Sequence, residues 1–147
     1  MKVQTILDQK SKVIFSADPE TTLCQAMDMM LEKNVTALIV MKNNDLEGII
    51  SQRDVMRICH VSANSPKELK VRDFMTRSEL LYTCGPDDTI EKLMDTMTEK
   101  RIKHIPVLKE DKLVGVISIG DIVKNLLDAA KSDNKLLNDY ISGNYPS

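Results

Sequence analysis

Two seven-residue segments of this chain carry the residue types best suited to holding an anion. The segment from Gly48 to Asp54 reads GIISQRD, and the segment from Gly115 to Asp121 reads GVISIGD. The Ser-x-x-Asp spacing is that of a capping box with Asp in place of Glu: the serine oxygen accepts the N3 amide and the acid reaches back to the N-cap amide. The same geometry also suits ligand binding, because free amides at a helix N-terminus attract phosphate and a nearby carboxylate can accept hydrogen bonds from a ribose diol.

These segments belong to two copies of one longer unit. Subtracting 67 carries Gly115 onto Gly48, and the same offset relates thirteen further pairs of identical residues, so that residues 13–57 map onto residues 80–124 without a gap. Neither copy is large enough to bury a good core alone. We therefore expect one pseudo-twofold module with its functional surface between the copies.

Each copy predicts the order strand, helix, strand, strand, helix, which gives an α+β fold. A short apolar run at 13–15, repeated at 80–82, leads through a turn into an amphipathic helix that begins after Thr22 or Thr89. The methionines of this helix fit a packed core better than a binding face. Two apolar runs around a polar turn then indicate a hairpin, and a second helix starts at Ser51 or Ser118. A glycine inside each second hairpin strand indicates close approach by another chain or a ligand.

The predicted organisation has four parts. Residues 1–60 form the first repeat with a short leading helix, residues 61–70 a linker, residues 71–131 the second repeat, and residues 132–147 a helical tail. The tail carries a small apolar stripe of Leu136, Leu137, Tyr140 and Ile141. This stripe either folds back on the module or packs on a partner, and we favour docking within the chain.

Composition restricts the partners. The 147 residues carry a net charge of −2 and no tryptophan, with 3% aromatic residues, which argues against nucleic acid. No apolar run is long enough for a membrane helix and the start lacks the apolar core of a signal peptide, so we expect a cytoplasmic protein that does not bind membranes. Cys24, Cys59 and Cys84 have no Cys-x-x-Cys spacing, so they are expected to be small buried hydrophobes rather than disulfides or zinc ligands.

From about Val3 to Ala130, the chain resembles a pair of cystathionine-β-synthase (CBS) domains, also called a Bateman module. The resemblance lies in the duplicated unit, in the G-h-h-S-x-x-D end of each copy (h, apolar) and in the segment HIPV at His104–Val107. The resemblance implies that the repeats pack sheet to sheet and leave two equivalent clefts for an adenosyl ligand. That ligand is AMP, ADP, ATP, NAD(H), NADP(H) or S-adenosylmethionine, and no metal cofactor is implied. It further implies a stand-alone regulatory protein that senses this ligand in signal transduction and forms a homodimer.

The resemblance also assigns site residues. In the first cleft, Ser51 lies near the phosphate and Asp54 binds the ribose, with Thr21 and the strand from Ile14 to Ala17 bordering the base. The equivalent positions of the second cleft are Ser118, Asp121, Asp88 and the strand from Leu81 to Cys84.

Charge should make the two clefts unequal. The resemblance implies that Lys103 and His104 face the phosphate of the first cleft, whereas their counterparts, Thr36 and Ala37, bring no charge to the second. His104 fits a satisfied strand histidine equally well. Arg53 fits either a phosphate ligand or a contact to a partner chain, and the nearby Lys100 and Arg101 also fit a solvated helix end.

Two other function classes lead to different expectations for this sequence. A serine nucleophile needs a histidine base, yet only His60 and His104 exist and neither is repeated, so we expect no enzyme. A ligand-independent dimeric scaffold that regulates an unknown client protein is the alternative to the sensor. Titration with adenine nucleotides separates the two. A homodimer with a helical interface is expected in either case, because one module cannot cover the apolar faces of all its amphipathic helices.

Overall fold

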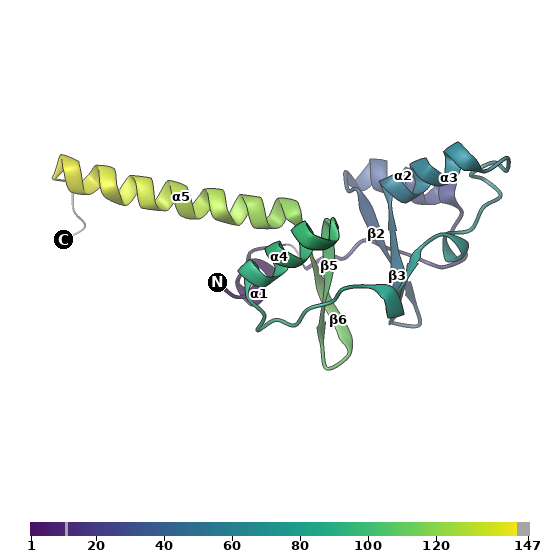
Figure 1. The fold of residues 1–147 in the computed structure, drawn as a ribbon, viewed down its shortest axis with the longest axis horizontal. Helices are drawn as coiled ribbons and strands as arrows, with labels where there is room; N and C mark the ends of the chain where they lie inside the picture. The colour runs from purple at the N-terminus through teal and green to yellow at the C-terminus, as the bar shows by residue number, and fades with distance from the viewer. Residues whose placement is uncertain (11, 144–147) are drawn as a thin grey trace.

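The computed structural model describes residues 1–10 and 12–143. Figure 1 shows two halves side by side and a long C-terminal helix, α5, that leaves the second half and extends away from both. One sheet has the strand order β1-β2-β3-β4 and the other pairs β5 with β6. The α+β class and the duplicated unit predicted from the sequence are confirmed.

The first repeat follows the predicted order of elements. They are β1 (Ser16–Ala17), α2 (Leu23–Lys33), β2 (Ala37–Lys42), β3 (Asp45–Ser51) and α3 (Gln52–Val61). β1 runs parallel to β2, and β2 pairs antiparallel with β3. Asn43 and Asn44 both have positive φ, as a two-residue hairpin turn of type I′ requires.

The second repeat has the same plan, displaced by 67 residues. Its elements are α4 (Ile90–Lys100), β5 (His104–Lys109), β6 (Lys112–Ser118) and α5 (Ile119–Ser142). The first strand is reduced to a parallel bridge between Cys84 and Val107, the counterpart of Ala17 and Val40. The strands β3 and β6 contact each other, so the sheets of the two repeats meet as expected.

The segments that lead into the repeats are exchanged. Helix α1 (Val3–Gln9) places Val3 and Ile6 in the core of the second repeat, beside Leu93 and Ile117. In the first core, Val71 occupies the corresponding place. This second lead forms the short 3₁₀ helices η1 (Val71–Asp73) and η2 (Ser78–Leu80) on either side of β4 (Thr76–Arg77), whereas the first lead is the α-helix α1. Each repeat therefore completes its core with a piece of the other.

The two strand glycines lie where the exchanged leads cross the sheets. A Cβ on Gly48 would clash with the carbonyl oxygen of Thr76, because β4 pairs with β3 at this point. A Cβ on Gly115 would come within 2.6 Å of the Leu7 side chain in α1. The predicted close approach is confirmed, and in both cases another part of the chain makes it.

The expectation that the tail docks on the module is wrong. Residues 119–142 form one continuous helix, and its exposed apolar residues include Leu136, Leu137 and Ile141. The last buried residue of α5 is Asn125, so nothing in the described chain covers the apolar face that follows. Across residues 1–10 and 12–143, no helix is both long enough and apolar enough to span a membrane.

Candidate functional site

Both Ser-x-x-Asp segments form the capping box that their spacing predicts. At the start of α3, the Ser51 amide donates to Asp54 Oδ2 at 2.9 Å and the Asp54 amide donates to Ser51 Oγ at 3.2 Å. At the start of α5, the corresponding distances between Ser118 and Asp121 are 2.9 and 3.1 Å. Capping uses one carboxylate oxygen of each aspartate, so the other oxygen is free for a second partner.

A cavity adjoins each capping box, and the one beside the second capping box is the larger. It has a volume of about 730 Å³, within the range of small-molecule sites, and we name it the Asp121 cavity. Ser118 and Asp121 line it together with the apolar segment 13–15 from the first repeat. Both repeats therefore contribute to this cavity.

Lys10 forms an ion pair with the Asp121 carboxylate. Its Nζ donates to Asp121 Oδ2 at 2.7 Å and to the carbonyl oxygen of Val116 at 2.6 Å. Burial raises the pKa of Asp121, but the hydrogen bonds from Lys10 and Ser118 outweigh burial and hold this pKa below its ordinary value. Asp121 is thus a charged, partly buried group that is already paired inside the protein.

The smaller cavity adjoins the first capping box. It has a volume of about 460 Å³ and is named here the Asp54 cavity. Ser51 and Asp54 line one side, and Leu80, Leu81 and Tyr82 line another. Asp54 Oδ1 accepts no hydrogen bond from any described residue, and the Asp54 carboxylate has no ion-pair partner among them, whereas the Asp121 carboxylate is paired with Lys10.

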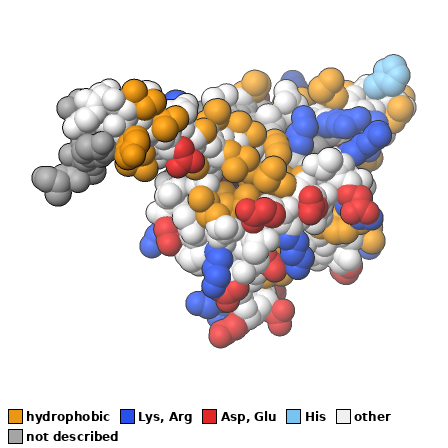
Figure 2. Space-filling view, turned by 60° about the vertical axis from the view of Figure 1, so that its left-hand side comes forward, with side chains coloured by type: hydrophobic (Ala, Val, Ile, Leu, Met, Phe, Trp, Pro, Cys, Tyr) orange, Lys and Arg blue, Asp and Glu red, His pale blue; other side chains and the backbone are white. Residues whose placement is uncertain are grey.

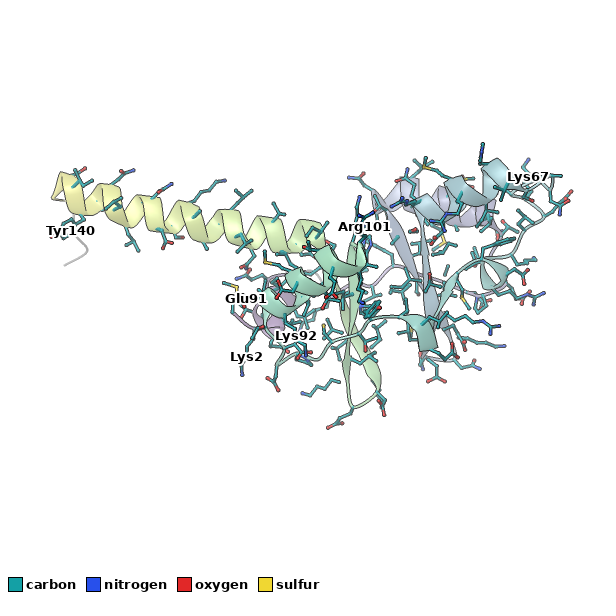
Figure 3. The ribbon with its side chains drawn as sticks, viewed as in Figure 1. Lys2, Lys67, Glu91, Lys92, Arg101 and Tyr140 are labelled. Carbon is teal, nitrogen blue, oxygen red and sulfur yellow. The ribbon has the colours of Figure 1, made fainter. Side chains whose placement is uncertain are left out.

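Cations surround the Asp54 cavity. Arg53 and Arg57 lie one turn apart on α3, and Arg101 and Lys103 come from the segment between α4 and β5. Figure 3 shows Arg101 at the end of α4, between the two halves. Within the part of the chain that the structure describes, none of these four cations has an ion-pair partner. With Asp54 the cavity carries a formal charge of four minus one, or +3, which suits a phosphate group.

His104 stands between the two cavities. Both His104 and Lys103 line each of them, together with Thr36 and Ile49. The Thr36 Oγ1 and His104 Nε2 atoms are 3.5 Å apart. Burial lowers the pKa of His104; Asp121 opposes this shift, and Lys10 and Lys103 add to it. Burial therefore favours the neutral imidazole, and an anion bound beside it would favour the charged form.

The structure corrects how the predicted residues were grouped. Ile14 was placed with Ser51 and Asp54, but it lines the Asp121 cavity. Leu81 was placed with Asp121, but it lines the Asp54 cavity. The reason is the exchange of leads: β4 pairs with β3, which brings the following residues 80–82 to the first repeat. Each apolar strand segment therefore faces the capping box of the other repeat.

Three predicted site residues line neither cavity. Ala17 is buried in the first core. Thr21 Oγ1 accepts from the Asp18 amide at 3.2 Å and so closes a turn. Asp88 accepts from the Gly85 amide at 2.7 Å, and this bond, followed by the ion pair with Lys92, lowers the pKa of Asp88. The positions of Thr21 and Asp88 are explained by turns before α2 and α4.

The residue patterns did not single out Lys10 and Arg57 as cavity residues, and Tyr82 was expected only as part of the strand from Leu81 to Cys84. Arg57 follows Arg53 by four residues on a predicted helix, so its place on the same face was available from the spacing. Tyr82 is the repeat counterpart of Phe15, and each aromatic ring carries a lysine ammonium, 5.7 Å from the Tyr82 centroid and 5.6 Å from the Phe15 centroid. Lys10 has a cationic repeat counterpart, Arg77, but nothing local in the sequence points to Asp121.

The three cysteines are free. Cys24 and Cys84 are half-buried, whereas Cys59 is exposed, so the expectation of a buried residue is wrong for Cys59. Burial, followed by the charge of Asp88, raises the pKa of Cys84 to about 11 against a smaller opposing effect of Lys92. Among the described residues, no group of three or more His, Cys, Asp or Glu side chains is placed to hold a metal ion.

Comparison with known proteins agrees with this architecture. The CBS domain family matches twice, at residues 10–61 and 71–128, which together cover most of the sequence. This chain belongs to the CBS domain family. Its two repeats are a CBS pair, and its cavities lie where both repeats contribute residues.

Three CBS proteins illustrate the relationship. The CBS domain-containing protein CBSX3, mitochondrial, of Arabidopsis thaliana is 38% identical over 129 residues, which are 86% of this chain and 63% of the plant protein. A Burkholderia ambifaria MC40-6 protein with CBS domains, proposed to act in signal transduction, superimposes with a TM-score of 0.82 at 33% identity and covers 87% of this chain and 95% of its own. A CBS pair solved with 5′-methylthioadenosine and S-adenosyl-L-methionine covers 88% of this chain and 98% of its own with a TM-score of 0.75. At 21% identity, this last likeness is one of fold alone.

Proposed function

We propose that this CBS pair is a regulatory module that binds an adenosyl ligand in the Asp54 cavity. The observation that carries the proposal is the free carboxylate oxygen of Asp54 among four cations without ion-pair partners. Asp54 Oδ1 accepts a ribose hydroxyl, while Arg53, Arg57 and Lys103 bind phosphate. Arginine suits this role because its guanidinium donates two parallel hydrogen bonds to one phosphate group.

The far wall of the cavity suits a nucleobase. Leu80, Leu81 and Tyr82 present an apolar slot, and Tyr82 adds a ring on which a purine stacks. The CBS pair solved with 5′-methylthioadenosine and S-adenosyl-L-methionine supports this ligand class for the fold. For the present chain we favour phosphate-bearing members of the class, AMP, ADP, ATP or NAD(P)(H), because of the arginines.

The Asp121 cavity is the second cleft of the proposed module. A ribose there meets a carboxylate whose charge is already paired, since the Lys10 ammonium holds Asp121 Oδ2 at 2.7 Å. We expect weaker ribose binding than in the Asp54 cavity, even though the volume of about 730 Å³ is larger. A ribose in this cavity therefore either binds Asp121 Oδ1 beside the Lys10 ion pair or displaces Lys10.

A sensor must respond to its ligand by a change of state. Both cavities are lined by residues of the two repeats, so a ligand changes how the repeats dock and, through them, how two copies of the module associate as a homodimer. Only a ligand that binds one state more tightly shifts the population, because equal affinity for both states shifts nothing. The cytoplasmic location, the absence of catalysis and the unidentified client protein stay predictions from the sequence.

The experiment is a thermal-shift screen of adenosyl compounds, preceded by native mass spectrometry of the purified protein. A ligand at about 100 times its dissociation constant adds roughly 2.7 kcal/mol to the free energy of unfolding. For a chain of this size the melting temperature should rise by about 5–10 °C. A melting temperature that no adenosyl compound changes would refute the sensor and favour the ligand-independent scaffold.

A further inference from the structure

The C-terminal part of α5 extends from the CBS pair as a free arm, which we define as residues 126–142. Ile122 and Asn125 are buried against the module, and no later residue of the helix is buried. Figure 2 shows hydrophobic side chains gathered along this arm and over the adjoining part of the module, and Tyr140, labelled in Figure 3, lies at the far end of the arm. The exposed residues include Leu127 at 55%, Leu137 at 57% and Ile141 at 74%.

The arm continues a heptad pattern that begins before it. The a and d positions of this pattern alternate in steps of four and three residues. They are Val123, Leu127, Ala130, Asn134, Leu137 and Ile141. At 100° per residue all six lie within about 40° of Val123, whereas Ile122 and Asn125 lie about 100° and 160° away. This heptad stripe, as we call the six residues, therefore faces away from the module over its whole length. Apolar residues at a and d positions are typical of a two-stranded coiled coil.

The charges beside the heptad stripe select the direction of pairing. Lys124 and Lys131 lie on one flank, and Leu126 and Asp133 lie on the other. In an antiparallel pair each flank meets the same flank of the second helix, so that Lys131 would face its own counterpart and Asp133 likewise. In a parallel pair opposite flanks meet, which places Leu126 against the aliphatic stem of Lys131 and separates the like charges.

Asn134 points to the same arrangement. It is the single polar residue of the heptad stripe and occupies an a position, with Leu127 and Ile141 one heptad away on either side. An asparagine at one a position fixes register and a two-stranded state, because it is satisfied only opposite the same residue of the second helix. The pattern thus specifies a second copy of this chain.

We propose that the arm pairs with the arm of a second copy as a parallel, in-register, two-stranded coiled coil. Parallel pairing of the two arms holds the two CBS pairs beside one another at the same end of the coiled coil. The proposal does not depend on ligand binding, because the arm contributes no residue to either cavity.

Cysteine cross-linking tests direction and register. In the full chain with Cys59→Ser, which removes the exposed thiol, Asn134→Cys should form a disulfide-linked dimer under mild oxidation. The matched control is Ser132→Cys, because residue 132 lies on the opposite side of the helix, about 180° from Val123. Equal cross-linking of both variants, or none in Asn134→Cys, would overturn the parallel in-register pair.

Adjacent leucines provide a second test that does not rely on oxidation. Leu136 and Leu137 are 59% and 57% exposed, but only Leu137 belongs to the heptad stripe. Leu137→Asp should weaken self-association about tenfold or more in sedimentation equilibrium, since it places an unpaired charge in the seam, whereas Leu136→Asp should not. A chain that is monomeric at all concentrations, or a dimer equally sensitive or insensitive to both substitutions, would refute the proposal.

Discussion

Replacing Asp54 by asparagine separates capping from ligand binding at one residue. The Ser51 amide uses one side-chain oxygen of Asp54 at 2.9 Å, and asparagine retains an oxygen for that bond. Its NH₂ group then takes the place of the free Oδ1, where it cannot accept a ribose hydroxyl. The loss of one charge-assisted hydrogen bond costs about 1.5–3 kcal/mol, which is roughly 10- to 100-fold in affinity.

The measurement is calorimetric titration with AMP and ATP, alongside thermal unfolding without ligand. We expect weaker binding to Asp54→Asn and a nearly unchanged melting temperature. Asp121→Asn is the matched control: it should lower the melting temperature, because the Lys10 ion pair at 2.7 Å is lost, yet leave binding in the Asp54 cavity unchanged. Wild-type affinity in Asp54→Asn would remove Asp54 from the site, and unfolding of that variant would show that capping is its main role.

Three further predictions address charge, packing and protonation. Binding in the Asp54 cavity should weaken more steeply with salt than binding in the Asp121 cavity, as calorimetry at several ionic strengths would show; equal slopes would contradict the charge difference. Gly48→Ala should lower the free energy of unfolding by about 1–3 kcal/mol, because the new methyl group would meet the backbone carbonyl of Thr76. Gly115→Ala should lower it by less, because the new methyl group would meet the Leu7 side chain, which can move; urea unfolding of the two variants measures the difference. Since burial lowers the pKa of His104 in the folded protein, the unfolded chain binds the proton at a higher pH than the folded chain does. Stability should therefore fall as pH decreases below 6.5, and His104→Gln should flatten that decline in urea unfolding; an unchanged slope would refute it.

Local rules account for what the sequence predicted correctly. The capping boxes follow from Ser-x-x-Asp spacing, and the hairpins follow from apolar runs around short polar turns. Both involve residues close in sequence, so no tertiary information is needed. The offset of 67 residues strengthened these predictions, because each element predicted in one repeat is also predicted at the equivalent position of the other.

The cavity grouping depended on contacts that no local rule contains. Whether Leu81 faces Asp54 or Asp121 is decided by which sheet β4 joins, and Thr76–Arg77 is too short to show a strand pattern. The docking of Lys10 on Asp121 spans 111 residues. The prediction that the tail docks on the module was wrong, because an apolar stripe on a helix can pack equally well on the module or on another helix.

The exchange of leads gives the two cavities different consequences. Lys10 follows α1, the helix that completes the second core, so a ligand that takes Asp121 from Lys10 removes a bond that holds this lead in place. The equivalent cation, Arg77, makes no ion pair among the described residues, and Asp54 is free. Filling the Asp54 cavity therefore breaks no such bond, whereas a ligand that displaces Lys10 from Asp121 would loosen the first lead. By reciprocity, a partner that holds α1 on the second repeat should weaken ligand binding beside Asp121 and leave the Asp54 cavity unaffected.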